Sequence, residues 1–154
     1  GEETDTLDLG GEVIKKDDKV ITAKELKEIL KKFIGKQNQL PPLYSAKKVN
    51  GKRACDLARS GKEVELKPKE IEIYNLELLE ELGENKFKVK ISCSSGTYVR
   101  AIVRDVAKEL NTCGMTLAIT RTKCGVLCIE NSFSLEDLRN GNYKLIDMKE
   151  FTKE

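Results

Sequence analysis

The chain has 154 residues, of which 35% are charged and 39% are apolar, so its composition is that of one globular domain and not of a disordered segment. Its net charge is only +2, and its five cysteines come with no histidine, which excludes Ser-His-Asp and Cys-His catalysis within the chain and argues against a zinc site. No apolar run approaches the roughly 20 residues that a membrane span needs, and the odd number of cysteines without secretory features predicts a cytoplasmic protein.

The first strong element in chain order is a helix that follows Thr22. Thr22 and Glu25 are spaced as a capping box, and Gly35 marks a suitable end. The apolar residues of this segment repeat at helical spacing: Leu26, Ile29, Leu30 and Phe33. Residues 37–53 are predicted to form a loop, because two adjacent prolines forbid a helix or a central strand. Asn50 and Gly51 fit a hairpin turn, and residues 53–60 are predicted to form a short helix.

Strands and helices alternate in the rest of the chain. Residues 71–78 indicate a strand with a bulge, and residues 86–93 alternate between polar and apolar as a half-buried strand does. A helix follows from residue 99, residues 117–130 are predicted to form two strands around Gly125, and a last helix begins at Ser134 with Leu135 and Leu138 predicted to be buried. The expected fold is therefore α/β in the broad sense, with a sheet covered by helices.

Residues 94–100 join a strand to the start of a helix, where free backbone N–H groups favour anions. Arg100 and Tyr98 offer a rigid guanidinium and an aromatic hydroxyl at that place. From these residues alone, a functional site and an ordinary surface ion pair are about equally well supported.

Two further segments carry basic residues. Residues 39–59 combine a proline-stiffened loop with Tyr44, Lys48, Arg53 and Arg59, as contact with a phosphate backbone requires, but from composition alone a rigid surface connection is the favoured interpretation. Arg121 lies among apolar residues of a predicted strand, where a solvated strand face is the simpler interpretation.

Taken together, these segments resemble the TruB family of pseudouridine synthases. The family's Q-x-P-P-x-Y-S-A-x-K-x-x-G pattern occurs at residues 39–51, its A-R-x-G step at 58–61 and its C-S-x-G-T-Y-[IV]-R pattern at 93–100. Its L-x-R-x-x-x-G pattern occurs at 119–125 with Ile119 in first place, and its T-D-T-x-D segment at 4–8. The family's G-x-L-D-P loop, which carries the nucleophilic aspartate, is not found, and Asp8 lacks the proline that would identify it as that residue.

The resemblance implies an α+β fold, a mixed and largely antiparallel sheet flanked by helices. It implies that residues 1–154 form a partial pseudouridine synthase catalytic domain, with the upstream aspartate segment and a C-terminal PUA domain absent. The complete enzyme is expected to be a monomer without cofactor or metal that isomerises a uridine in the T-stem-loop of tRNA, and the fragment alone is expected to be inactive.

The resemblance also implies roles for individual residues. Arg100 would pair with the catalytic aspartate, and Tyr98 would line the pocket of the extruded uridine. The remaining residues would contact the RNA substrate: Ile119, Tyr44, Lys48, Arg53, Arg59 and Arg121. Three alternatives remain open at this point, namely a non-catalytic RNA-binding module, a guide-RNA-dependent relative of the dyskerin type, and a plain structural domain.

Overall fold

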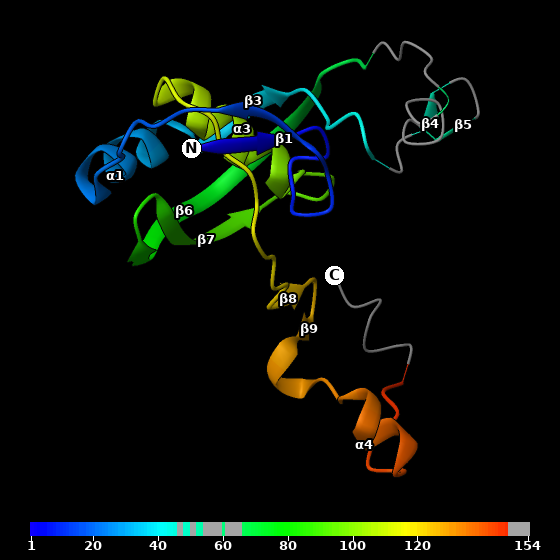
Figure 1. Cartoon of the computed structure of the whole chain (residues 1–154). Coiled ribbons are helices and arrows are strands. Elements are labelled where there is room, and N and C mark those ends of the chain that lie inside the picture. The colour runs from blue at the N-terminus through cyan, green and yellow to red at the C-terminus, as the bar shows by residue number, and fades with distance from the viewer. Residues whose placement is uncertain (46–47, 50–51, 54–59, 61–65, 148–154) are drawn as a thin grey trace. The chain divides into compact units, whose positions relative to one another are not determined.

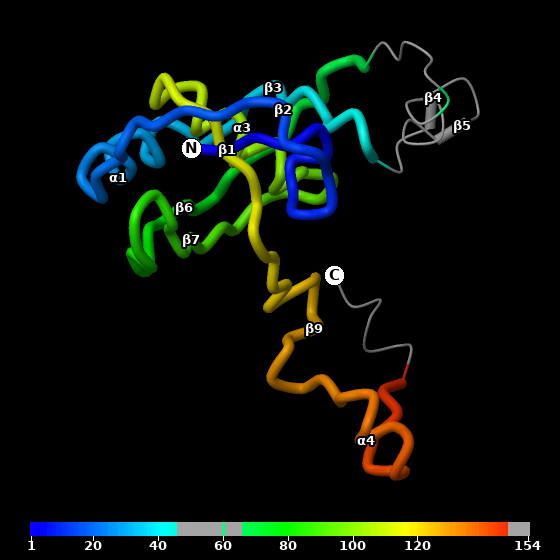
Figure 2. Tube along the Cα trace, in the orientation of Figure 1, coloured from blue at the N-terminus to red at the C-terminus, as the bar shows by residue number. Residues whose placement is uncertain are grey.

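The computed structural model describes residues 1–45, 48–49, 52–53, 60 and 66–147, which belong to two compact units, Gly1–Leu117 and Ala118–Glu154 (Figure 1, Figure 2). The elements of the first unit are β1 (Glu2–Thr4), β2 (Val13–Lys16), α1 (Ala23–Lys32), β3 (Gly35–Gln39), β4 (Lys48–Val49), β5 (Lys52–Arg53), β6 (Lys69–Gly83), β7 (Lys86–Cys93) and α3 (Val99–Glu109). Strands β1 and β2 pair antiparallel, and β3, β6 and β7 form an antiparallel sheet in that order.

The sheet β3-β6-β7 is built on the long strand β6. Its register against β7 shifts between Ile73 and Asn75, which confirms the predicted bulge. On the exposed face, Lys88 pairs with Glu80 at 3.8 Å and Lys90 with Glu77 at 4.0 Å. Along the described chain, no strand pairs with the outer edge of β7.

Strand β3 corrects the sequence-based prediction, which placed residues 37–39 in a loop. Its sequence, Gly-Lys-Gln-Asn-Gln, has no apolar alternation and therefore gives no strand signal of its own. Its strand conformation comes from ladder pairing with β6, from Gly35 opposite Ile73 to Gln39 opposite Lys69.

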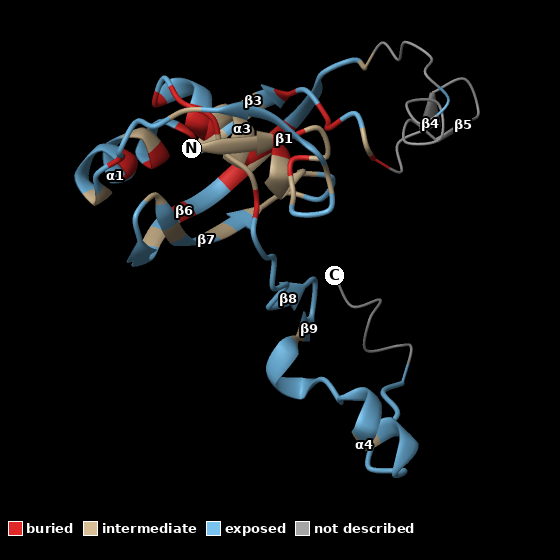
Figure 3. Ribbon diagram, in the orientation of Figure 1, coloured by how far each residue is buried: buried red, intermediate tan, exposed pale blue. Residues whose placement is uncertain are grey.

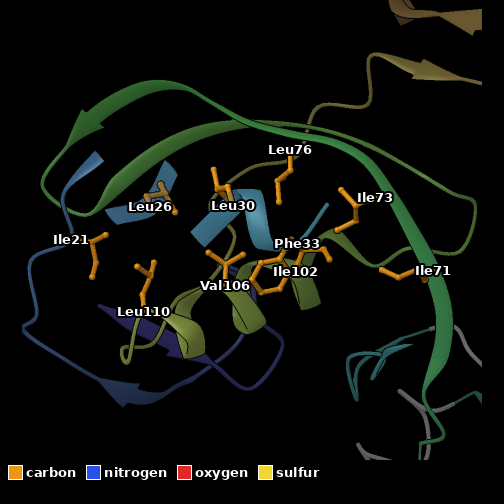
Figure 4. Close-up of a cluster of buried hydrophobic side chains, with 10 residues drawn as sticks. All are labelled: Ile21, Leu26, Leu30, Phe33, Ile71, Ile73, Leu76, Ile102, Val106 and Leu110. Carbon is orange, nitrogen blue, oxygen red and sulfur yellow. The ribbon is translucent and has the colours of Figure 1, made fainter. Parts of the chain in front are cut away.

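Helices α1 and α3 cover the sheet and enclose the core. The capping box is confirmed, because Thr22 Oγ1 accepts a hydrogen bond from the Glu25 N–H and the Glu25 carboxylate accepts one from the Thr22 N–H. The core side chains from both helices and from β6 point toward one another (Figure 4): Ile21, Leu26, Leu30, Phe33, Ile71, Ile73, Leu76, Ile102, Val106 and Leu110. Each helix therefore buries the stripe that its sequence predicts.

The pairing of β4 with β5 supports the predicted hairpin. Lys48 lies opposite Arg53 and Val49 opposite Lys52 in antiparallel register. The predicted helix at 53–60 is contradicted at its first residue, which belongs to β5, and residues 54–59, including Arg59, fall outside the described residues.

The second unit consists of short elements: β8 (Lys123–Cys124), β9 (Leu127–Cys128), a 3₁₀ turn (Ile129–Asn131) and α4 (Leu135–Arg139). Two strands around Gly125 and the helix after Ser134 are confirmed, but the strands cover only residues 123–124 and 127–128 of the predicted 117–130, and Arg121 lies outside them. The prediction that Leu135 and Leu138 are buried is wrong. They are 73% and 47% exposed, since no side chain among residues 118–147 is buried to form a core with them (Figure 3).

Helices with antiparallel sheets, and one isolated parallel bridge between Asp8 and Thr116, give the mixed α/β class that was expected. Within the described part of the chain, every helix is too short or too polar to cross a membrane.

Candidate functional site

The turn between β7 and α3 is fixed to the sheet at its first residue. The Ser94 N–H donates to the Glu72 carbonyl at 2.8 Å, and Ser94 Oγ accepts from the Glu72 N–H at 2.9 Å. Thr97 Oγ1 then donates to the Ser94 carbonyl at 2.8 Å, and Gly96 takes a φ of +83°, a conformation that glycine adopts without steric cost. The chain therefore enters α3 along a defined path.

Arg100, in the first turn of α3, brings three distant segments together. Its Nη1 donates to the Thr6 carbonyl at 2.6 Å and to Asp8 Oδ2 at 2.8 Å, while Nη2 donates to the Tyr44 carbonyl at 3.0 Å. The Arg100 side chain is 24% exposed and that of Asp8 is 38% exposed. The guanidinium is thus held by charge and by two backbone carbonyls, yet it remains reachable from solvent.

Asp8 is held in a tight loop of the β1–β2 connection. Thr6 Oγ1 donates to Asp8 Oδ1 at 2.7 Å, and the Gly10 N–H donates to the same oxygen at 3.0 Å. The Thr6 hydroxyl, and after it the Gly10 N–H and the charge of Arg100, lower the pKa of Asp8 below its ordinary value, while partial burial opposes them. Asp8 is therefore an ionised partner for Arg100 at neutral pH.

The loop that carries Asp8 is itself anchored. Leu7 is buried although its φ is +63°, an uncommon conformation for a residue with a branched side chain. The Thr116 N–H donates to the Leu7 carbonyl at 3.0 Å, next to the parallel bridge between Asp8 and Thr116. These contacts fix the position from which Asp8 meets Arg100.

The guanidinium of Arg104, one turn further along α3, makes its hydrogen bonds within the protein. Its guanidinium donates to both oxygens of Asp105, at 2.7 and 3.1 Å, and to the Leu40 carbonyl at 2.9 Å. Its side chain is only 11% exposed. Arg104 therefore ties the proline-containing segment to α3 and contributes little to a basic surface.

The other residues singled out in the sequence are distributed unevenly. Tyr98 is half-buried and is the N-cap of α3, and the Tyr44 backbone meets Arg100. Lys48 and Arg53 lie in β4 and β5, where only the backbone is described. Arg59 is outside the described residues. Ile119 and Arg121 are exposed in the second unit.

Sequence analysis missed two members of this site. The sequence argued against Asp8 as the nucleophile, but nothing in its pattern indicated that Asp8 would be the partner of Arg100. Gln39 is 3% exposed, and its side chain bonds to the Tyr98 backbone. Its place in a polar segment gave no sign of burial.

The Arg100 Nε–H group is the part of the guanidinium that Asp8 and the two carbonyls do not engage. Among the described residues, no acceptor is assigned to the Arg100 Nε–H group. A guanidinium presents its donors as a planar fork, so a further carboxylate or phosphate could bind on that edge. No cluster of three or more histidine, cysteine or acidic side chains suited to a metal ion occurs in the described part of the chain.

Comparisons with known proteins agree on one family. Residues 1–99 match the family model for the TruB family pseudouridylate synthase (N terminal domain). The chain is 39% identical, over 99% of its length, to tRNA pseudouridine synthase B of Caldanaerobacter subterraneus, and 40% identical, over 94% of its length, to the proteins of that name from Francisella philomiragia and Caulobacter vibrioides. It spans 54%, 48% and 46% of these relatives, which is about half of their length.

Proposed function

Because this chain belongs to the TruB family of pseudouridylate synthases, we propose that it forms part of an enzyme that isomerises uridine to pseudouridine in the T-loop of tRNA. The observation that supports this best is the fixed Arg100 guanidinium, held by Asp8 and two backbone carbonyls, with no acceptor for its Nε–H among the described residues. The names of the relatives do not favour a guide-RNA-dependent enzyme or a non-catalytic RNA-binding module.

The proposed reaction rearranges one nucleotide. The C1′–N1 bond breaks, the base turns, and a C1′–C5 bond forms; C5 loses its proton and N1 gains one, so the composition does not change. The uridine must first leave its stack, which costs a few kcal/mol that contacts in the pocket offset. We assign Tyr98 to the wall of that pocket and Ile119 to apolar contact with the base.

The nucleophile of this reaction is proposed to be an aspartate outside residues 1–154. The G-x-L-D-P pattern that carries it in the family is not found in this sequence, and Asp8 is already paired with Arg100. Arg100 would hold the incoming carboxylate on its free edge, opposite Asp8, and keep it ionised and oriented toward C1′.

Substrate RNA is the proposed partner of the remaining basic residues. Single-stranded RNA loops are recognised by stacking and by charge. We therefore assign Lys48, Arg53, Arg59 and Arg121 to phosphate contacts, and Tyr44 to the same surface. We further propose that the complete enzyme is a monomer and acts in the cytoplasm.

The test is the conversion of uridine in a T-stem-loop RNA. The 154-residue chain alone should give no pseudouridine, whereas its fusion to the aspartate-bearing segment of the Caldanaerobacter relative should be active. Arg100→Lys in the fusion should lower kcat by about 100-fold, because a lysine cannot present the fork that positions the carboxylate. Lys108→Ala, an exposed position on the same helix, should have no effect.

Two results would contradict the proposal. Turnover by residues 1–154 alone would show that the chain contains its own nucleophile. A folded fusion that binds the RNA with a steep salt dependence but never converts uridine would favour an RNA-binding module.

A further inference from the structure

The side-chain amide of Gln39 makes two hydrogen bonds with the backbone of Tyr98. Its Nε2 donates to the Tyr98 carbonyl at 3.1 Å, and its Oε1 accepts from the Tyr98 N–H at 2.8 Å. Gln39 is the last residue of β3 and is nearly completely buried. The side-chain amide therefore donates one hydrogen bond and accepts another, as the backbone of a paired residue on a neighbouring strand would.

This contact is made where α3 has no cap of its own. Tyr98 is the N-cap residue, and its side chain makes no capping hydrogen bond. A helix start is normally fixed by such a bond. Here the Tyr98 carbonyl accepts from the Ala101 and Ile102 N–H groups as well as from Gln39, so Gln39 is connected to the first turn of the helix that carries Arg100.

Two residues after Gln39 also contact α3. The Leu40 carbonyl accepts from Arg104 and the Tyr44 carbonyl accepts from Arg100. Three contacts thus connect residues 39–44 to α3 and to its N-cap residue. The sequence left open whether this segment is a phosphate surface or a rigid connection, and two of its carbonyls accept hydrogen bonds from arginines of α3.

We propose that Gln39 is a positioning residue of the synthase site, which sets the N-terminal turn of α3 so that the Tyr98 ring and the Arg100 guanidinium hold the geometry that catalysis needs. This inference rests on the proposed function. Gln39 would touch neither the reacting atoms nor the RNA, and would act through Tyr98 and Arg100.

The chain offers a matched control on the same strand. Gln37 lies two residues earlier, on the same face of β3, and its Nε2 donates to the Phe33 carbonyl at 2.7 Å, at the end of α1. Gln39→Met and Gln37→Met each keep the length of the side chain and remove its hydrogen bonds. Only the first variant acts on the turn before α3.

The first measurement needs no catalysis. In ¹⁵N relaxation of the 154-residue chain, Gln39→Met should make the Arg100 Nε–Hε bond clearly more mobile, while Gln37→Met should leave it unchanged. Gln39→Glu keeps an acceptor for the Tyr98 N–H, so its Arg100 mobility should lie between that of the parent chain and that of Gln39→Met. It serves as the second variant if Gln39→Met does not fold.

The second measurement uses the active fusion and the T-stem-loop RNA. Gln39→Met should lower kcat roughly tenfold to hundredfold with KM unchanged, because misplaced catalytic groups slow the chemical step more than they weaken binding. If Arg100 mobility and kcat are the same in all variants, Gln39 is only structural and the proposal is overturned. If the parent fusion is inactive, the proposed function fails, and the relaxation data still decide whether Gln39 positions Arg100.

Discussion

The two units of this chain are built from similar local signals but differ in what those signals achieve. α1 and α4 both begin with a complete capping box, Thr22 with Glu25 and Ser134 with Asp137. The apolar stripe of α1 enters a core with α3 and β6, whereas the apolar side chains of α4 are exposed. Local hydrogen bonds thus suffice to define a helix, but only burial of its stripe adds the hydrophobic stabilisation that a folded domain requires.

The sharpest test of this comparison is the removal of one apolar side chain from each unit. Ile73 is completely buried, so Ile73→Ala should lower the free energy of unfolding by about 3–4 kcal/mol through lost transfer energy and a residual cavity. Leu138→Ala, at an exposed position of α4, should change it by less than about 0.5 kcal/mol. Urea denaturation followed by circular dichroism measures both values, and equal losses would show that residues 118–147 do contribute to a common core.

The two capping boxes allow a second, smaller comparison. Thr22→Ala should destabilise the first unit by about 1 kcal/mol, because α1 is part of its core and the Glu25 N–H loses its acceptor. Ser134→Ala removes the equivalent 3.0 Å bond to the Asp137 N–H. It should speed hydrogen exchange in α4 and leave exchange in α1 unchanged. A parallel acceleration in both helices would contradict the separation of the units.

The smallest expected effect concerns the Asp8–Arg100 pair, which belongs to the first unit but is partly open to solvent. The pKa of Asp8 is lowered in the folded state, so its ionised form stabilises the fold above the ordinary pKa of about 4. This contribution is lost as the pH falls through the lowered pKa. Asp8→Asn should therefore cost about 0.5–1 kcal/mol near pH 7, and the difference should shrink below about pH 4.

Thermal unfolding of the parent and of Asp8→Asn across that pH range tests the sign. Asp18→Asn, at an exposed position of the same unit, serves as the control. A difference between parent and Asp8→Asn that grows toward low pH would show that the carboxylate is not stabilised in the folded state.

Much of the first unit could be predicted because its signals are local. The capping box at Thr22, the alternation of residues 86–93 and the apolar stripe of the helix after Tyr98 each determine an element without help from distant residues. Strand β3 could not be predicted, because five residues without apolar alternation become a strand only by pairing with β6. Burial of Leu135 and Leu138 was expected from spacing alone, and spacing does not tell whether a partner surface exists.

The site shows the same difference between features set by local sequence and features set by distant residues. The Tyr98–Arg100 turn was visible as a strand-to-helix junction with unusual polar residues. The partners of Arg100 were not, since Asp8 and the Tyr44 carbonyl lie 92 and 56 residues away in the sequence. Their meeting depends on how β1, β3 and α3 come together, which sequence periodicity does not describe.

The row of lysines on β7 has a consequence for self-association. Lys86, Lys88 and Lys90 project from the same face of a strand whose outer edge is unpaired within the described residues. A second copy that added its own β7 to this edge would bring two rows of ammonium groups side by side, with the nearest glutamates already used on β6. Like-charge repulsion between the two rows would therefore oppose such strand pairing.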